Sequence, residues 1–249
     1  MKVFSRNEQI DDLKCKLAED DLNKIVQNCF QIEGIDNSND KLAIYLFLQA
    51  ISMVGIDYIE YNYEFLDIRT GGKRKKLVQK RHLERTFTYE LYRIWQNLVK
   101  LYMTNIRVDA EIGKKITYQG INNIKLGKLK GDSKIPDFVL HASQGNTDNH
   151  TIICEVKRDE NLCKTKIKYD IVKICRYMDT KIWNEHPYKF GCFILASKDR
   201  DEESFNKAIN LMKDELMYFK DKISFNHLFC IIYDGHEVKY DTLKNILNI

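Results

Sequence analysis

Two short apolar segments separated by a polar loop constrain the fold of this chain more than any other feature. Residues 136–141 (PDFVLH) and 151–158 (TIICEVKR) are rich in β-branched and aromatic residues and are bounded by turn formers, which is typical of strands. Residues 144–150 (QGNTDNH) form a polar loop of the kind that joins antiparallel neighbours. The sequence therefore predicts a β-hairpin here.

The expected register of this hairpin gathers three charged residues. A loop centred near residue 147 would place Asp137 opposite Lys157. Glu155 lies two residues before Lys157, so the two share one face of the strand. Ile153 is expected on that face, and Cys154 and Val156 on the other. Two close carboxylates repel each other, and a divalent cation relieves the repulsion. Oxygen ligands suit Mg²⁺ or Mn²⁺, and an adjacent ammonium could hold a metal-bound water as hydroxide.

This arrangement resembles the PD-(D/E)xK nuclease superfamily, which includes restriction endonucleases, junction resolvases and recombination exonucleases. The matching residues are Pro136, Asp137, Glu155 and Lys157, in a strand–turn–strand context. The resemblance implies that Asp137 and Glu155 bind the metal, with the Val156 carbonyl as a further ligand. It also implies that Lys157 assists the attacking water.

The bare (D/E)xK pattern is common and has little specificity by itself. It also occurs at residues 12–14, 132–134 and 237–239. Only the copy at Glu155 follows a Pro-Asp strand start at hairpin distance and an apolar strand. The alternative is a Pro-Asp turn with an exposed Glu/Lys pair on an edge strand, which is nearly neutral for stability.

Two helices flank the hairpin in sequence. Helical spacing predicts one over residues 81–103, with the apolar stripe Leu83, Phe87, Leu91, Ile94, Trp95, Leu98 and Leu101. Many PD-(D/E)xK folds carry an acidic residue on this helix that reaches the metal, which implies that role for Glu90 first and Glu84 second. A surface Glu paired with Arg or Lys is the alternative for either residue.

The second helix is expected over residues 163–183, with Ile167, Ile171, Ile174, Cys175 and Met178 on its buried side. Lys166, Asp170, Lys173 and Tyr177 share another face. Some branches of the superfamily have a Gln-xxx-Tyr signature here, near the substrate backbone. Lys173-xxx-Tyr177 keeps the spacing and the Tyr but has Lys for Gln. The resemblance implies nucleic-acid contacts for Lys173, Arg176 and Tyr177, and an ordinary amphipathic helix is the alternative.

Two basic stretches could contact phosphates. Residues 70–76 (TGGKRKK) are a candidate linker with a cationic run, for which a solvated turn is the alternative. Residues 119–134 form a Gly- and Lys-rich loop just before Asp137, and its Lys130 and Lys134 are candidate nucleic-acid contacts. A basic loop beside a carboxylate site is useful when the ligand is a polyanion.

The remaining periodicity predicts an α/β protein. Helices are expected over residues 8–33, 41–54 and 202–220, with a short one over 241–249, and residues 59–66 fit helix or strand. Residues 105–113 and 115–118 are expected to form a first strand or a hairpin, and strands are expected over 189–197 and 228–233. Asp234-Gly235 predicts a hairpin into 236–240. We expect a restriction-endonuclease-like core over residues 81–249, with a mixed sheet flanked by helices. Residues 1–80 would be a mainly helical N-terminal appendage.

Composition limits the other classes of function. Apolar residues make up 44% of the chain, enough for a core, and the formal net charge of +4 is mild. No two of the seven cysteines have CxxC spacing, which predicts reduced thiols and a cytoplasmic location. No window approaches the length of a membrane span, so no membrane partner is expected. No histidine pair has helical zinc spacing, and there is no GxxxxGK(S/T) for ATP.

The leading hypothesis is a Mg²⁺-dependent DNA endonuclease in restriction, defence or DNA processing, with the N-terminal helices serving dimerisation or target recognition. One alternative is a catalytically inactive nuclease fold that binds nucleic acid or other proteins. Another is an interaction protein in which Asp137, Glu155 and Lys157 form surface ion pairs.

Overall fold

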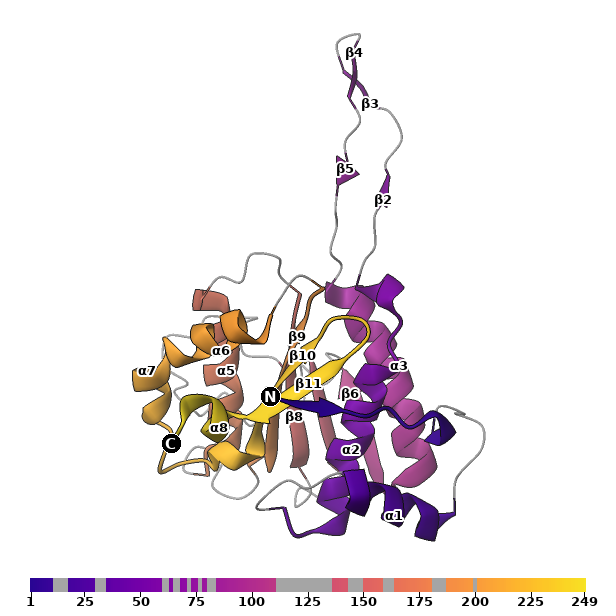
Figure 1. Ribbon diagram of the computed structural model, residues 1–249, viewed down its shortest axis with the longest axis vertical. Coiled ribbons are helices and arrows are strands. Elements are labelled where there is room, and N and C mark those ends of the chain that lie inside the picture. Colours follow the sequence, from indigo (N-terminus) through magenta and orange to yellow (C-terminus); the bar gives the residue numbers. More distant parts are fainter. Residues whose placement is uncertain are drawn as a thin grey trace.

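The computed structural model describes residues 1–10, 18–29, 35–59, 63–64, 68–70, 73–75, 78–79, 84–110, 136–142, 150–158, 164–180, 187–198 and 201–249 (Figure 1).

A seven-stranded mixed sheet with the order β1-β11-β10-β9-β8-β7-β6 forms its centre. The strands are β1 (Lys2–Phe4), β6 (Ile106–Ala110), β7 (Phe138–Ala142), β8 (His150–Lys157), β9 (Phe190–Ala196), β10 (Leu228–Tyr233) and β11 (Val238–Thr242). β8, β9 and β10 run parallel, whereas the other neighbours in this sheet are antiparallel. All residues of β9 and β10 are buried, as expected for strands covered on both faces.

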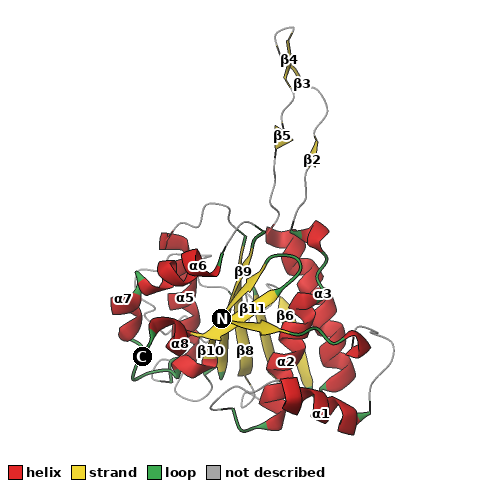
Figure 2. Cartoon of the chain, viewed as in Figure 1, coloured by secondary structure: helices red, strands yellow, loops and turns green. Residues whose placement is uncertain are grey.

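Helices cover both faces of the sheet (Figure 2). The described residues form α1 (Glu19–Cys29), α2 (Ser38–Ser52), α3 (Glu84–Tyr102), α5 (Lys164–Met178), α6 (Glu202–Asn210), α7 (Lys213–Met217) and α8 (Leu243–Leu247). The side chains of α2 and α3 pack in one core with Cys154 and Val156 of β8. Those of α5, α6 and α8 pack in a second core with Ile153. The expected division of β8 into two faces is therefore confirmed.

Gly191 on β9 lets α5 lie close to the sheet. A Cβ atom at this position would lie 2.3 Å from Ile174 Cγ2 and 2.6 Å from Met178 Sδ, closer than real Cβ contacts. Both neighbours belong to α5, and Gly191 is paired with Ile153 of β8. The missing side chain therefore brings α5 within reach of the charged end of β8.

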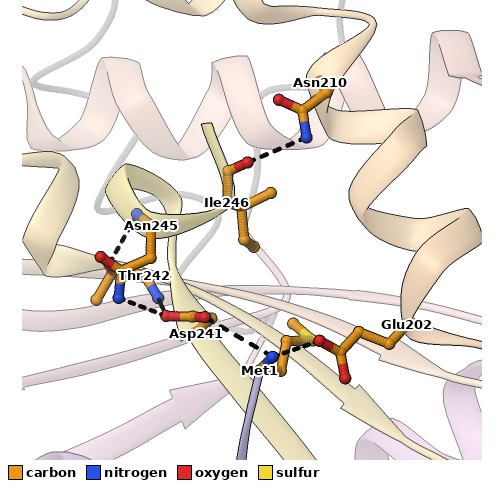
Figure 3. A network of polar contacts seen from close by, with 7 residues as sticks. All are labelled: Met1, Glu202, Asn210, Asp241, Thr242, Asn245 and Ile246. Carbon is orange, nitrogen blue, oxygen red and sulfur yellow. Dashed lines mark hydrogen bonds and ion pairs between the residues drawn. The ribbon is translucent and has the colours of Figure 1, made fainter. Parts of the chain in front are cut away.

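The N-terminal residues belong to the same body as the rest of the chain. β1 pairs with β11 at one edge of the sheet, and α2 is buried in the core that it shares with α3. The amino group of Met1 forms an ion pair with Glu202 of α6 and lies 3.9 Å from Asp241 of β11 (Figure 3). The segment expected to be an appendage therefore contributes a strand to the sheet and a helix to its cover.

A two-part β-ribbon stands apart from this body (Figure 1). β2 (Tyr63–Glu64) pairs with β5 (Val78–Gln79), and β3 (Ile68–Thr70) pairs with β4 (Lys73–Lys75), both antiparallel. We call these four strands the arm. The basic residues 73–75, expected in a linker, are instead one strand of a hairpin.

Several element boundaries differ from those expected. The helix predicted over residues 202–220 is divided into α6 and α7, and residues 8–10 form a short 3-10 helix before α1. The turn between β10 and β11 is confirmed: Gly235 has a φ of 100°, and Asp234 Oδ1 accepts hydrogen bonds from the His236 and Glu237 N–H groups at 2.9 and 2.8 Å. Among the described residues, no helix combines the length and apolar character needed to cross a membrane.

Candidate active site

The β7–β8 hairpin forms, but its register differs from the expected one by two residues. Phe138 pairs with Cys154 and Leu140 with Ile152, so Asp137, just before β7, comes opposite Glu155 and not Lys157. The register shifts between Leu140 and His141, where β8 has one extra residue, and a symmetric loop does not account for this bulge. Because side chains alternate with period two, a two-residue shift leaves them on the expected face.

Asp137 is tied to β8 by its backbone and its side chain. Its N–H donates to the Cys154 carbonyl at 3.2 Å, and its Oδ2 accepts from the Val156 N–H at 2.7 Å. Val156 is the residue between Glu155 and Lys157. The Asp137 carboxylate is therefore held at the point on β8 where the other two predicted residues project.

Two charged residues of α5 complete the cluster. Lys173 Nζ lies 2.6 Å from Glu155 Oε1 and 3.6 Å from Asp170 Oδ1. Lys157 Nζ lies 3.1 Å from Asp170 Oδ2. We call these five residues (Asp137, Glu155, Lys157, Asp170 and Lys173) the charged cluster. It contains three carboxyl groups and two ammonium groups.

The charged cluster is largely removed from water. Glu155 is 2% exposed, Lys173 is 6% exposed and Asp170 is 8% exposed. Burial raises the pKa of the Glu155 carboxyl well above its usual range, and the negative charges of Asp137 and Asp170 add to this, whereas Lys173 opposes it. The surroundings of Glu155 thus disfavour its charged form, and a positive charge beside it offsets part of this effect.

The cluster has oxygen atoms that could bind a cation. Among the described residues, Glu155 Oε1 and Asp170 Oδ2 are buried without accepting a hydrogen bond, although each faces an ammonium at ion-pair distance. The described residues contain no group of three or more His, Cys, Asp or Glu side chains gathered as a metal site. A hard divalent cation at Asp137 and Glu155 would therefore take further ligands from backbone oxygen or water, as Mg²⁺ commonly does.

The structure places Lys173 and Tyr177 in the interior. Lys173 pairs with Glu155, and Tyr177 is 3% exposed and packs edge-to-face against Tyr188. Arg176 is half-buried. Lys173, one of the three predicted nucleic-acid contacts on α5, thus belongs to the charged cluster. Contact of Arg176 and Tyr177 with nucleic acid stays a prediction.

The acidic residues of α3 lie in a different setting. Glu90 forms a two-point contact with Arg93, with Arg93 Nε donating to Oε2 at 2.9 Å and Nη2 donating to Oε1 at 2.6 Å. This is the pairing considered as the alternative for Glu90, and its reach to the metal stays a prediction. The side chain of Glu84, and Lys130 and Lys134, lie outside the described residues.

The sequence interpretation placed Asp170 on the same helix face as Lys173 but gave it no role in the site, and it did not predict that Lys173 is buried. Both lie beside apolar residues of α5 that are completely buried, Ile171 and Ile174. Charged residues this close to a buried stripe usually have a charged partner, because an unpaired buried charge is strongly unfavourable. That signal was present in the sequence, but the partner on β8 depends on how closely the helix approaches the sheet.

A second polar group lies on the neighbouring strands. His141 Nε2 lies 2.7 Å from Asp109 Oδ2, and Arg107 Nη2 lies 3.1 Å from the same oxygen. The hydrogen bond with His141 lowers the pKa of the Asp109 carboxyl. His141 is thus hydrogen-bonded to a carboxylate that also pairs with Arg107.

No family model, curated protein or solved structure matches the chain.

Proposed function

We propose that this chain is a Mg²⁺- or Mn²⁺-dependent DNA endonuclease of the PD-(D/E)xK type. The observation that carries the proposal is the hydrogen bond from the Val156 N–H to Asp137 Oδ2. It fixes one carboxylate beside Glu155 and Lys157, the acid and the amine that phosphodiester hydrolysis requires.

The element order supports the same proposal. Among the described residues, a helix (α3) is followed in chain order by three antiparallel strands (β6–β8), a second helix (α5) and a parallel strand (β9). This is the order that the resemblance implies for the nuclease core, with the charged residues at the start of the second strand and the end of the third. Since unrelated chemistry can occur on one fold, the cluster itself carries more weight.

In this proposal Asp137 and Glu155 hold the cation, and the Val156 carbonyl is a candidate further ligand. The bound ion would supply Lewis acidity to the phosphoryl oxygen and lower the pKa of its water. Lys157 would orient the attacking water and stabilise its hydroxide form through Nζ. Asp170, 3.1 Å from that Nζ, would keep the ammonium charged and fix its direction.

Lys173 would serve as an internal counter-ion. It offsets the Glu155 charge at 2.6 Å, so the carboxyl groups can be packed together before a metal ion binds. When the ion binds, Glu155 would exchange some of its contact with Lys173 for the metal. Asp170, whose Oδ1 lies 3.6 Å from Lys173 Nζ, would then remain as the carboxylate partner of that ammonium group.

Cleavage of supercoiled and linear DNA with Mg²⁺ or Mn²⁺, with and without EDTA, tests the proposal. Asp137→Asn keeps an acceptor for Val156 while removing the charge, and Glu155→Gln and Lys157→Met make matched changes. Each should lower cleavage at least about 100-fold, more than changes to residues that only orient a metal ligand. Mn²⁺ binding by calorimetry should weaken in the two carboxylate variants.

The chain contains its own control for these variants. Glu237 and Lys239 have the same spacing at β11 and lie 3.6 Å apart in a partly exposed pair. Glu237→Gln and Lys239→Met should leave cleavage and metal binding unchanged. Equal cutting by parent, Asp137→Asn and Lys157→Met would overturn the assignment.

One observation favours a second function, a nuclease fold that binds nucleic acid without cutting it. Lys173 and Lys157 already pair with Glu155 and Asp170, so each of these two carboxyl groups has a counter-ion without a metal. A folded protein that binds DNA but neither binds Mn²⁺ nor cuts DNA would support this alternative.

A further inference from the structure

The arm leaves the body at the end of the sheet that holds the charged cluster. Arg158, directly after Lys157, donates from Nη1 to the Tyr58 carbonyl at 3.0 Å. Tyr58 ends the 3-10 helix that precedes the arm, and α3 begins at Glu84 after it. Figure 1 shows β2–β5 standing away from the sheet, beyond the start of α3.

Positive charge is concentrated in the outer half of the arm. Residues 68–76 (IRTGGKRKK) contain five Lys or Arg and no Asp or Glu, whereas residues 60–67 (EYNYEFLD) contain three acids and no base. β3 and β4 together contribute Arg69, Lys73, Arg74 and Lys75. The segment that leads into β3 is thus acidic, the segment of β3 and β4 is strongly basic, and the returning segment 77–83 (LVQKRHL) adds two further bases.

The register places cations across from each other. Arg69 is paired with Arg74, while Thr70 is paired with Lys73 and Ile68 with Lys75. Like charges at opposite positions destabilise an antiparallel pair, and a two-stranded hairpin is only marginally stable in water. Because neighbouring register positions belong to opposite faces of a ribbon, both faces carry cationic positions. A bound polyanion would relieve this repulsion on either face.

We propose that the arm is a DNA-binding element that contacts the backbone of duplex DNA with Arg69, Lys73, Arg74 and Lys75. The choice of DNA as partner rests on the proposed function. The major groove of B-DNA accepts a two-stranded β-ribbon, and a ribbon with cations at register positions of both faces can reach phosphates on both groove walls. The deep, narrow major groove of duplex RNA does not accept it. The arm thus holds the duplex beside the end of β8.

Fluorescence anisotropy with a 30-base-pair DNA probe in EDTA tests the inference without catalysis. The arm variant carries Arg69→Gln, Lys73→Gln, Arg74→Gln and Lys75→Gln. The control carries the same loss of charge at exposed body positions, Lys100→Gln, Lys207→Gln, Lys220→Gln and Lys244→Gln. Urea unfolding of both variants should match that of the parent, because neither set alters a buried residue of the body.

The arm variant should bind the duplex at least about tenfold more weakly than the control. The slope of log K against log salt should fall by about 0.9 for each phosphate that the variant no longer neutralises, or by up to about 3.6 for four phosphates. A duplex RNA of the same sequence should bind more weakly and respond little to the arm changes.

Equal binding by the arm variant and the control would overturn the inference, as would a dependence on the arm confined to duplex RNA. Aggregation of the arm variant with unchanged DNA binding would also overturn it, and would assign the lysines to protection of the hairpin edges. The binding measurement is made in EDTA and does not depend on catalysis. Its outcome therefore stands even if the proposed nuclease activity is not found.

Discussion

Lys173 of α5 and Glu155 of β8 form a buried ion pair, with Lys173 Nζ 2.6 Å from Glu155 Oε1. The pair connects the second helix of the proposed nuclease core to the strand that carries two of its three proposed catalytic residues. Substitutions in and around the pair can therefore be used to measure its contribution to stability separately from its contribution to the proposed activity.

The ion pair should be sensitive to the loss of one partner and tolerant of the loss of both. Lys173→Met leaves the Glu155 carboxyl buried without its counter-ion, which should lower the free energy of unfolding by about 3–5 kcal/mol. The double variant Glu155→Gln, Lys173→Met should recover most of this loss. Urea denaturation of the four members of the cycle measures the coupling. Additive effects of the two changes would contradict the pairing.

Asp170 should act as a positioning residue for Lys157, whose Nζ lies 3.1 Å away. If the chain is a nuclease, Asp170→Asn should lower kcat about 10–100-fold, because the ammonium loses the group that directs it. DNA affinity in EDTA should not change. The exposed Asp214 of α7 provides the control, since Asp214→Asn should leave both quantities unaltered. A change in KM alone would contradict a role through Lys157.

Gly191 should tolerate no side chain, because its Cβ would lie 2.3 Å from Ile174 Cγ2. Gly191→Ala should lower the free energy of unfolding by about 1–3 kcal/mol through overpacking. Adding Ile174→Ala should make the glycine substitution less harmful, which a double-mutant cycle would reveal as favourable coupling. Gly55→Ala is the control, because its Cβ would lie 3.7 Å from Tyr58 Cδ2, an ordinary contact. Equal effects of the two glycine changes would exclude close helix approach as the cause.

The Asp109–His141 pair should stabilise the fold in a pH-dependent manner. The folded-state pKa of Asp109 lies below its ordinary value of 3.8 because of its hydrogen bond with His141. Its stabilising contribution is therefore fully present above about pH 3.8 and is lost as the pH falls through the lowered folded-state value.

Asp109→Asn should thus unfold at lower urea concentration than the parent at pH 7. The difference should shrink as the pH falls below about 3.8, where the unfolded chain takes up a proton, and should vanish once the folded parent is protonated at its lower pKa. Asp214→Asn should follow the parent throughout. A difference that keeps growing as the pH falls below about 3.8 would have the wrong sign for this pair.

Strands with strong local signals could be predicted from sequence. The apolar run in residues 228–233 is β10 without a change of bounds, and β9 and α2 lie within two or three residues of expectation. The β-bulge at Leu140/His141 was not predictable, because one extra residue leaves the hydrophobic pattern of β8 almost unchanged. β1 has only three residues and pairs with a strand more than 230 positions away, so no local pattern identifies it.

The candidate site was predictable only where it depends on alternation along β8. Period two places Glu155 and Lys157 on one face whatever the register. The contacts of Lys173 and Asp170 depend instead on the helix–sheet distance, which Gly191 sets through packing. The distance between a helix and a sheet cannot be predicted from the spacing of apolar residues within either segment alone.

In the proposed nuclease, the ammonium group beside Glu155 has a consequence for the order of folding and metal binding. Many metal-binding sites stay unfolded until their ion arrives, because the ligands repel one another. Here the repelling acids lie next to amines from the same chain, so the newly made polypeptide can complete its fold in a cell compartment poor in free divalent ions. If the proposed function holds, adding the ion would start activity in the folded protein, and chelation would stop it reversibly without unfolding the chain.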